Sequence, residues 1–257
     1  TTFGLRFGIN GPHAARTMML DDLQALLAAV PPESAKQDYV NQINDLNLLG
    51  KPTKKSRELA ARHLVALYGL DPALPLFRMF RALWANDTAA RPVLALTVAI
   101  ARDPLLAGTQ EWMLQQPQGG HVSREALEAA LTISHPDRFS DASLKSFAQN
   151  VNGTWTSAGY LMGKARKIKT QPTITPANAV FCLFLGYLEG MAGQRLFTSR
   201  WSKLLAGTQQ DIEALVSAAH HRGLVVFLQA GGVKEVRFPG RLTPAEEQSR
   251  QELTYDL

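Results

Sequence analysis

Apolar residues recur at the three-to-four-residue spacing of an amphipathic helix along most of the chain. Helix-ending residues divide this pattern, with Pro31 and Pro32 after the first segment and Gly69 and Gly223 after two later ones. The pattern predicts helices over residues 13–30, 34–46, 53–68, 72–86, 87–101, 103–116, 123–133, 140–151, 176–191, 199–205, 209–222 and 244–253. Residues 93–101 and 177–188 are apolar on every side, so we expect both to be buried.

One stretch near the end of the chain departs from the helical period. Residues 224–238 (LVVFLQAGGVKEVRF) place two β-rich runs on either side of Ala230-Gly231-Gly232, which predicts a tight hairpin. The linker PQGG at residues 117–120 separates an N-terminal helical domain, 1–116, from a C-terminal helical domain, 121–257. The expected fold class is therefore mainly α, with two helical lobes and a winged-helix-like β-hairpin in the second.

The C-terminal elements follow the order of a winged helix-turn-helix: short helix, turn, longer helix, hairpin. In that arrangement the helix over 209–222 enters the major groove of DNA and the hairpin touches the backbone. The inner face of this unit is predicted to pack on residues 177–188 and to comprise Leu204, Leu205, Ile212, Leu215, Val216, Val226 and Leu228. Because the longer helix also carries Asp211 and Glu213, a unit that binds only protein stays open.

The composition fits a soluble protein with a sizeable core. The 257 residues are 46% hydrophobic, and 27 Lys and Arg against 22 Asp and Glu give a formal net charge of +5, which permits a nucleic-acid partner without requiring one. The single cysteine, Cys182, lies in an apolar run and is expected to pack as a small hydrophobe in a reducing compartment. The longest apolar runs fall short of the roughly 20 residues that span a bilayer, so a cytoplasmic location is expected.

Two segments hold an excess of cations. Lys51, Lys54, Lys55 and Arg57 crowd the start of the helix over 53–68, where they oppose the helix dipole, and Lys164–Lys169 contains no acid. Such segments are typical of phosphate contacts, although a solvated surface is an equally open interpretation. The predicted nucleic-acid-binding residues, including those of the C-terminal unit, are Lys51, Lys54, Lys55, Arg57, Arg62, Lys164, Arg166, Lys167, Lys169, Arg222, Lys234 and Arg237.

The sequence carries no pattern typical of catalysis. It lacks a Gly-rich phosphate loop, an HExxH pair and a GxSxG elbow. None of the histidines has a cysteine or carboxylate at ligand spacing, so each is predicted to be a lone surface residue. We therefore expect no enzymatic activity, no catalytic residues, no metal and no cofactor.

Four segments together resemble the BREX phage-resistance protein A (BrxA) family. They are GINGPHAARTMMLDDLQALL at 8–27, INDLNLLGKPTKKSRELAARHL at 43–64, RPVLALTVAIARDPLL at 91–106 and SDASLKSFAQNVNGTWTSAGYLMGKARK at 140–167. The most specific piece is Ala158-Gly159-Tyr160-Leu161, and the resemblance covers roughly residues 9 to 170.

The resemblance implies a mostly helical, non-catalytic, DNA-binding accessory protein of a bacterial anti-phage (BREX-like) defence system. Its expected partners are double-stranded DNA and other subunits of that system, with no membrane. The alternative is an interaction adaptor or scaffold subunit of a defence complex that does not contact DNA.

Overall fold

The computed structural model describes residues 2–254 and is mainly helical, as the sequence predicted. It has two small antiparallel hairpins: the one near the C-terminus was predicted, and the one within residues 161–169 was not. In its first half lie η1 Pro12–Ala14, α1 Leu20–Ala29, α2 Lys36–Asn44, α3 Lys54–Tyr68, α4 Pro75–Asn86, α5 Arg91–Arg102, α6 Pro104–Ala107 and α7 Gln110–Gln115. There follow α8 Arg124–Ser134, α9 Asp141–Ser157, β1 Leu161–Met162, β2 Ile168–Lys169 and α10 Pro176–Leu188. The chain closes with η2 Gly193–Thr198, η3 Ser202–Leu205, α11 Gln209–His221, β3 Val226–Ala230, β4 Val233–Arg237 and α12 Pro244–Thr254.

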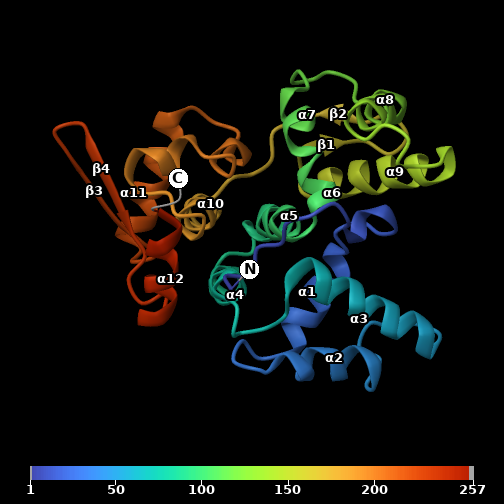
Figure 1. Ribbon diagram of the computed structural model, residues 1–257, viewed down its shortest axis with the longest axis horizontal. Helices are drawn as coiled ribbons and strands as arrows, with labels where there is room; N and C mark the ends of the chain where they lie inside the picture. The colour runs from blue at the N-terminus through green and yellow to red at the C-terminus, as the bar shows by residue number, and fades with distance from the viewer. Residues whose placement is uncertain (1, 255–257) are drawn as a thin grey trace.

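Helices α4, α5 and α10 occupy the middle of the molecule, and the other elements surround them (Figure 1). The α1–α3 group packs on one side, α8, α9 and the β1–β2 hairpin form a second group, and α11, α12 and the β3–β4 hairpin form a third. Every residue from 93 to 102 of α5 is buried, and α10 is buried almost throughout. Both helices are apolar on all sides, which is the pattern that favours complete burial.

Side chains cap three of the predicted helices at their first residues, and the predicted hairpin turn forms. Thr53, Ser123 and Ser140 each accept a hydrogen bond from the backbone N–H three residues ahead. Gly231 and Gly232 form the two-residue turn of the β3–β4 hairpin with φ values of 57° and 82°, which glycine adopts without steric cost.

The predicted first helix begins later than expected, because a buried polar network holds the chain before it. His13 Nδ1 lies 2.7 Å from a carboxylate oxygen of Asp103, and its Nε2 lies 2.9 Å from the Thr154 hydroxyl. The same hydroxyl accepts the backbone N–H of Met18, so the chain bends, and Met19 has a φ of 52° just before α1. The prediction that every histidine is a lone surface residue is therefore wrong for His13, which is fully buried.

Asp103 is buried and saturated with donors. One of its oxygens accepts the backbone N–H groups of Leu105 and Leu106, and the other accepts the backbone N–H of His13. Burial alone would raise the pKa of this carboxyl, but the bonds from His13 and Leu106 outweigh it, so the pKa lies below its ordinary value. The ionised carboxylate thus joins the N-terminal segment to the start of α6, while His13 links it to α9.

Two buried arginines connect segments of the N-terminal half by donating hydrogen bonds to backbone carbonyl groups. Arg81 is buried and donates to the carbonyl oxygens of Leu27 at 2.7 Å and Val30 at 2.6 Å. These carbonyls lie at the C-terminal end of α1, where helical carbonyl groups have no partner within the helix. Arg102 donates to the carbonyls of Gly4 and Ala66, and burial lowers its pKa to about 10.

The PQGG segment takes part in the sheet instead of standing free. Gly119 N–H donates to the carbonyl of Lys169, Lys169 N–H donates to that of Gly120, and His121 forms a bridge with Ile168. In addition, η1 packs on α9, and α10 packs on α4 and α5, so elements on both sides of residues 117–120 share the core. The domain division at this segment stays a prediction.

The C-terminal elements appear in the predicted order, but three of the seven predicted inner residues are less buried than expected. Leu204, Leu205, Ile212 and Val216 are buried, and α11 packs on α10. Leu228, predicted to face inward, is 46% exposed, because the β3–β4 hairpin extends beyond the helices that would cover it (Figure 1). Leu215 and Val226 are only partly buried. We therefore expect truncation of Leu215 to cost less than that of a fully buried leucine, for which about 2–5 kcal/mol is typical.

No single helix in the described part of the chain is long and apolar enough to cross a membrane. Helices α5 and Pro104–Gln115 meet the length and composition criteria only together, as a pair bent by 105°.

We expect His13→Ala to lower the free energy of unfolding by about 3–5 kcal/mol, because it leaves the buried Asp103 carboxylate without its side-chain partner. Urea unfolding measures this loss, and His221→Ala, at an exposed histidine, serves as the matched control. Equal stability of both variants would show that the network contributes little.

Asp103 also predicts a pH dependence. Because its folded pKa is depressed, its contribution is complete above the unfolded value of about 3.9 and is lost as pH falls through the folded value. Asp103→Asn removes this titration, so below about pH 4 its stability should fall less steeply with acid than that of the parent. If the acid-unfolding curves of Asp103→Asn and the parent were parallel, Asp103 would not be the source of this pH dependence.

Candidate nucleic-acid interface

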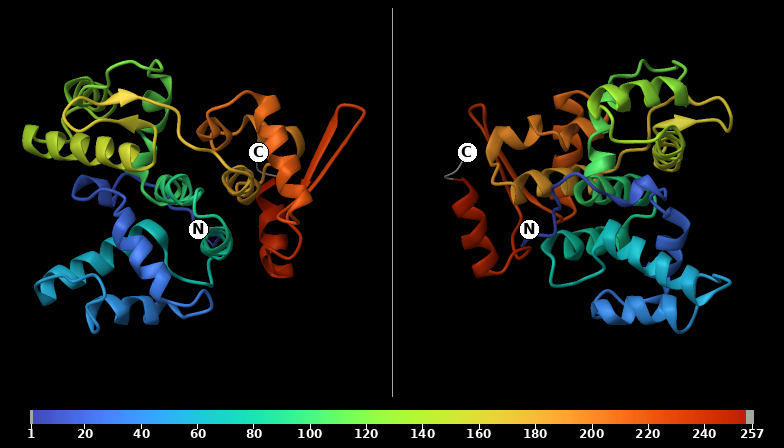
Figure 2. Two further views of the ribbon diagram at one scale, coloured as in Figure 1. Left: turned by 180° about the vertical axis from the view of Figure 1, so that it is seen from behind. Right: turned by 45° about the vertical axis from the view of Figure 1, so that its right-hand side comes forward.

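The predicted nucleic-acid-binding residues fall into two groups at opposite ends of the molecule. Those of α3 and of the β1–β2 hairpin lie at one end, and Arg222, Lys234 and Arg237 lie at the other (Figure 1, Figure 2). The two groups therefore belong to separate surfaces.

At the start of α3, the cations differ in how free they are. Lys55 and Arg62 are exposed, and neither makes an ion pair or side-chain hydrogen bond with another residue in the range 2–254. Lys54 is exposed, with Glu58 at 3.9 Å. Lys51, by contrast, lies 2.9 Å from Asp22, and Arg57 donates to the carbonyl of Asn44. Of the four cations crowding the helix start, Lys54 and Lys55 are thus the most available to an anion.

The β1–β2 loop holds the second set of cations on a defined backbone. Gly163 has a φ of 96°, and a Cβ at this position would lie 2.2 Å from the carbonyl oxygen of Arg166, so only glycine fits. Lys167 closes the loop by donating to the Gly163 carbonyl at 2.7 Å. Lys164 and Arg166 are exposed and lack a side-chain partner among the residues that the structure describes.

Helix α9 lies between these two segments. Gly153 lines a cleft together with Lys164 and Lys167, and Ser157 lines a second cleft together with Lys51 and Ser56 of the α3 side. Residues four apart lie on one face of a helix, so both clefts open along the same side of α9. The loop after η1 lies between α3 and α9 (Figure 1), and a Cβ added at Gly153 would lie 3.1 Å from Cγ2 of Thr17 in this loop.

Arg16, in the same loop, is a cation that the sequence prediction missed. It is exposed and lines the second cleft. Burial lowers the pKa of His63, and the positive charges of Arg16 and Arg62 lower it further, so these three side chains lie near one another. No local sequence signal marks Arg16, because its nearest basic neighbours come from α3. We call Arg16, Lys54, Lys55, Arg62, Lys164, Arg166 and Lys167 the α9 basic strip.

Lys169 does not belong to this strip, and its prediction as a phosphate contact is wrong. Its side chain is 3% exposed, and Nζ donates to the carbonyl of Met113 at 3.1 Å. The ammonium also lies 5.2 Å from the ring of Tyr160 and 5.9 Å from that of Trp155. Burial lowers its pKa to about 8. Lys169 is in β2, whose residues alternate between the two faces of the hairpin, and this position faces inward.

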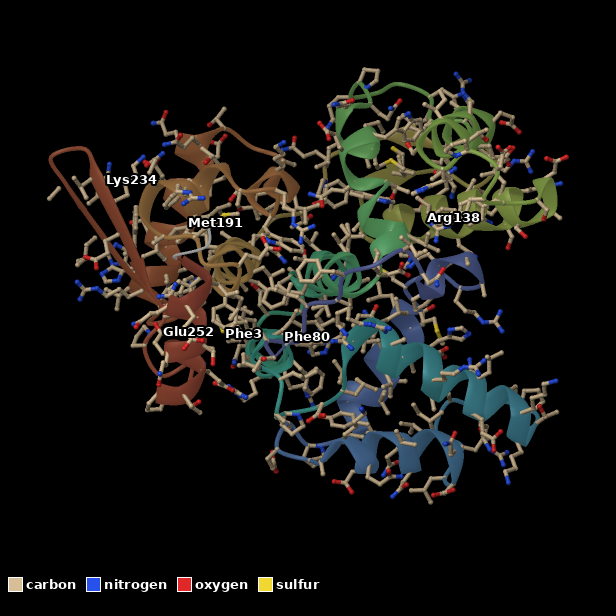
Figure 3. All side chains as sticks on the ribbon, in the orientation of Figure 1. Phe3, Phe80, Arg138, Met191, Lys234 and Glu252 are labelled. Carbon is tan, nitrogen blue, oxygen red and sulfur yellow. The ribbon has the colours of Figure 1, made fainter. Side chains whose placement is uncertain are left out.

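In the C-terminal group, two of the three cations are already paired. Lys234 lies on the inner side of β4, paired with Glu213 of α11 and 5.6 Å from the ring of Phe197 (Figure 3). Arg237 makes two hydrogen bonds to the carboxylate of Glu235, at 2.6 and 2.9 Å. The prediction of Lys234 as an exposed wing contact is wrong, whereas Arg222 is exposed and has no side-chain partner among the described residues.

No second functional site is indicated by a metal-binding cluster among the described residues or by a related protein. Within residues 2–254, no three or more His, Cys, Asp or Glu side chains come together in a way that could hold a metal ion. No protein-family model matches the chain, and no curated protein sequence matches it.

We expect Lys234→Ala to lower the free energy of unfolding by about 1 kcal/mol, because it removes a shielded ion pair and a contact with an aromatic ring. Arg237→Ala, at the exposed pair on the same strand, should leave stability unchanged. Thermal unfolding of the two variants checks this difference, and an unchanged midpoint for Lys234→Ala would show that its pair is only a surface contact.

Proposed function

We propose that this protein is a non-catalytic DNA-binding accessory protein of a bacterial anti-phage defence system of the BREX-like kind. The observation that carries the DNA-binding part is the α9 basic strip, whose cations come from three separate segments. Arg16 lines one of the two clefts beside α9, and Lys164 and Lys167 line the other. Apart from Lys54, which lies 3.9 Å from Glu58, the strip's cations form no ion pair among residues 2–254, so their charge is available to phosphate. The assignment to a defence system rests on the resemblance of residues 9 to 170 to the BrxA family.

The strip favours contact with the DNA backbone over reading of sequence. Its members are lysines and arginines spread along a surface, and phosphate contacts of this kind fix position without carrying sequence information. The predicted reading helix, α11, has Glu213 engaged by Lys234, and the hairpin beside it offers few free cations. We therefore infer weak sequence preference and a steep dependence of affinity on salt.

A second candidate function is an adaptor that binds protein, and a groove favours it. An apolar groove of about 700 Å³ lies between the N-terminal segment, the end of α10 and α12, and its lining includes Phe3, Met191 and Glu252 (Figure 3). The exposed Phe7 and Leu253 add to its apolar rim. Docking on such a surface depends on apolar area and changes little with salt.

Charge reversal tests the proposal. Lys55, Lys164 and Arg166 changed together to Glu should weaken binding to a DNA duplex by more than tenfold at moderate salt. The slope of log affinity against log salt should fall by about three, roughly one for each lost phosphate contact. Fluorescence anisotropy at several salt concentrations measures both quantities.

Lys36, Lys145 and Lys203 changed to Glu provide the matched control, since these lysines are exposed and lie outside the strip. Equal weakening in both triple variants would mean that only net charge matters. A parent protein that does not bind duplex DNA at low salt would leave the adaptor as the better function.

A further inference from the structure

One of the two clefts beside α9 has the features of a built binding site. It has a volume of about 470 Å³ and lies between the start of α8, the C-terminal half of α9 and the β1–β2 loop. Its polar lining includes His121, Ser123, Gln149, Asn152, Lys164 and Lys167. Pockets of some 300–1,000 Å³ hold small ligands, so a single nucleotide fits this space.

Asn152 is the feature that the fold itself does not explain. Its side chain is 6% exposed and lines the cleft, yet Oδ1 is buried without a hydrogen-bond partner. No hydrogen bond joins its carboxamide to another residue within the described range. Buried polar groups are nearly always bonded, because an unsatisfied one carries its full desolvation cost. A ligand that donates a hydrogen bond would satisfy this oxygen.

The opposite wall of the cleft supplies positive charge. Lys164 is exposed and unpaired among residues 2–254, and Lys167 is held in place by its bond to Gly163. The one acidic side chain in the lining, Glu125, is hydrogen-bonded at 2.7 Å to Arg124. The cleft thus combines cations for an anionic group with a buried acceptor for a polar donor.

We propose that this cleft binds one phosphorylated nucleotide, with the phosphate on Lys164 and Lys167 and a base or sugar donor on Asn152. A phosphate would neutralise the two ammonium groups. The amide oxygen would accept a hydrogen bond from an amino group of a base or a hydroxyl group of a sugar. The nucleotide can be free or can be the phosphorylated end of a strand. The proposal rests on the proposed function in that it gives the Lys164 end of the α9 basic strip a specific ligand.

Calorimetric titration with deoxyadenosine monophosphate, and with deoxyadenosine, tests the cleft directly. The parent should bind the monophosphate and lose most of that affinity when the phosphate is absent. Asn152→Leu replaces the amide by an apolar group of similar size, so it should weaken binding about tenfold without lowering the thermal unfolding midpoint. Lys164→Ala should weaken binding to a similar extent, and Lys145→Ala, an exposed lysine nearer the start of α9, should have no effect.

A short single strand with or without a terminal phosphate distinguishes the two sources. Tighter binding of the phosphorylated strand than of the free nucleotide assigns the cleft to strand ends, and the reverse assigns it to a free nucleotide. Equal binding of the monophosphate by the parent, Asn152→Leu and Lys164→Ala would overturn the proposal. The absence of any binding of the monophosphate to the parent would also overturn it. Duplex binding is measured on the same variants. A protein that binds the nucleotide but not the duplex contradicts only the proposed DNA function, and one that binds the duplex but not the nucleotide contradicts only the nucleotide site.

Discussion

The arrangement of the molecule depends on the hydrogen bonds that His13 makes to Asp103 and Thr154. These three residues come from the N-terminal segment, the junction of α5 and α6, and α9, and all three are fully buried. Asp103 also caps α6 by accepting two of its backbone N–H groups. Because a buried charge or imidazole without partners is costly, the three segments are stable only together. The network therefore fixes α9 against the loop that carries Arg16.

The candidate interface follows from that constraint. With α9 held in place, two clefts lie beside it. Arg16 of the loop after η1 and Lys51 line one cleft, and Lys164 and Lys167 of the β1–β2 loop line the other. An Asp–His–Thr set resembles the hydrogen-bonded order of a catalytic triad, but here every member is enclosed and Thr154 already accepts a backbone N–H from Met18. We interpret this set as structural, and we interpret the charged surface above it as the part that meets a ligand.

The two ends of the molecule use their cations differently. Around α9 several remain free, whereas on the C-terminal hairpin Lys234 and Arg237 are bound by neighbouring glutamates. Around α9 the positive charge is available to phosphate, whereas on the C-terminal hairpin it stabilises local structure. The apolar groove by Phe3 and Met191 lies in a third region, so one chain has separate surfaces that suit nucleic acid and protein.

The sequence determined the helices, their caps and the Gly231-Gly232 turn, because these depend on residues within one or two turns of each other. Thr53 and Ser140 cap the helices that follow them whatever lies elsewhere in the fold. Tertiary structure decided which polar side chains are free. Lys164 and Lys169 belong to one basic run, yet only Lys169 is enclosed by Trp155, Tyr160 and Met113. Likewise, His13 is buried by a partner 141 residues away, and Arg16 gains its charged neighbours only when α3 packs beside its loop. Local pattern contains no information on such distant partners, whereas burial and charge depend on them.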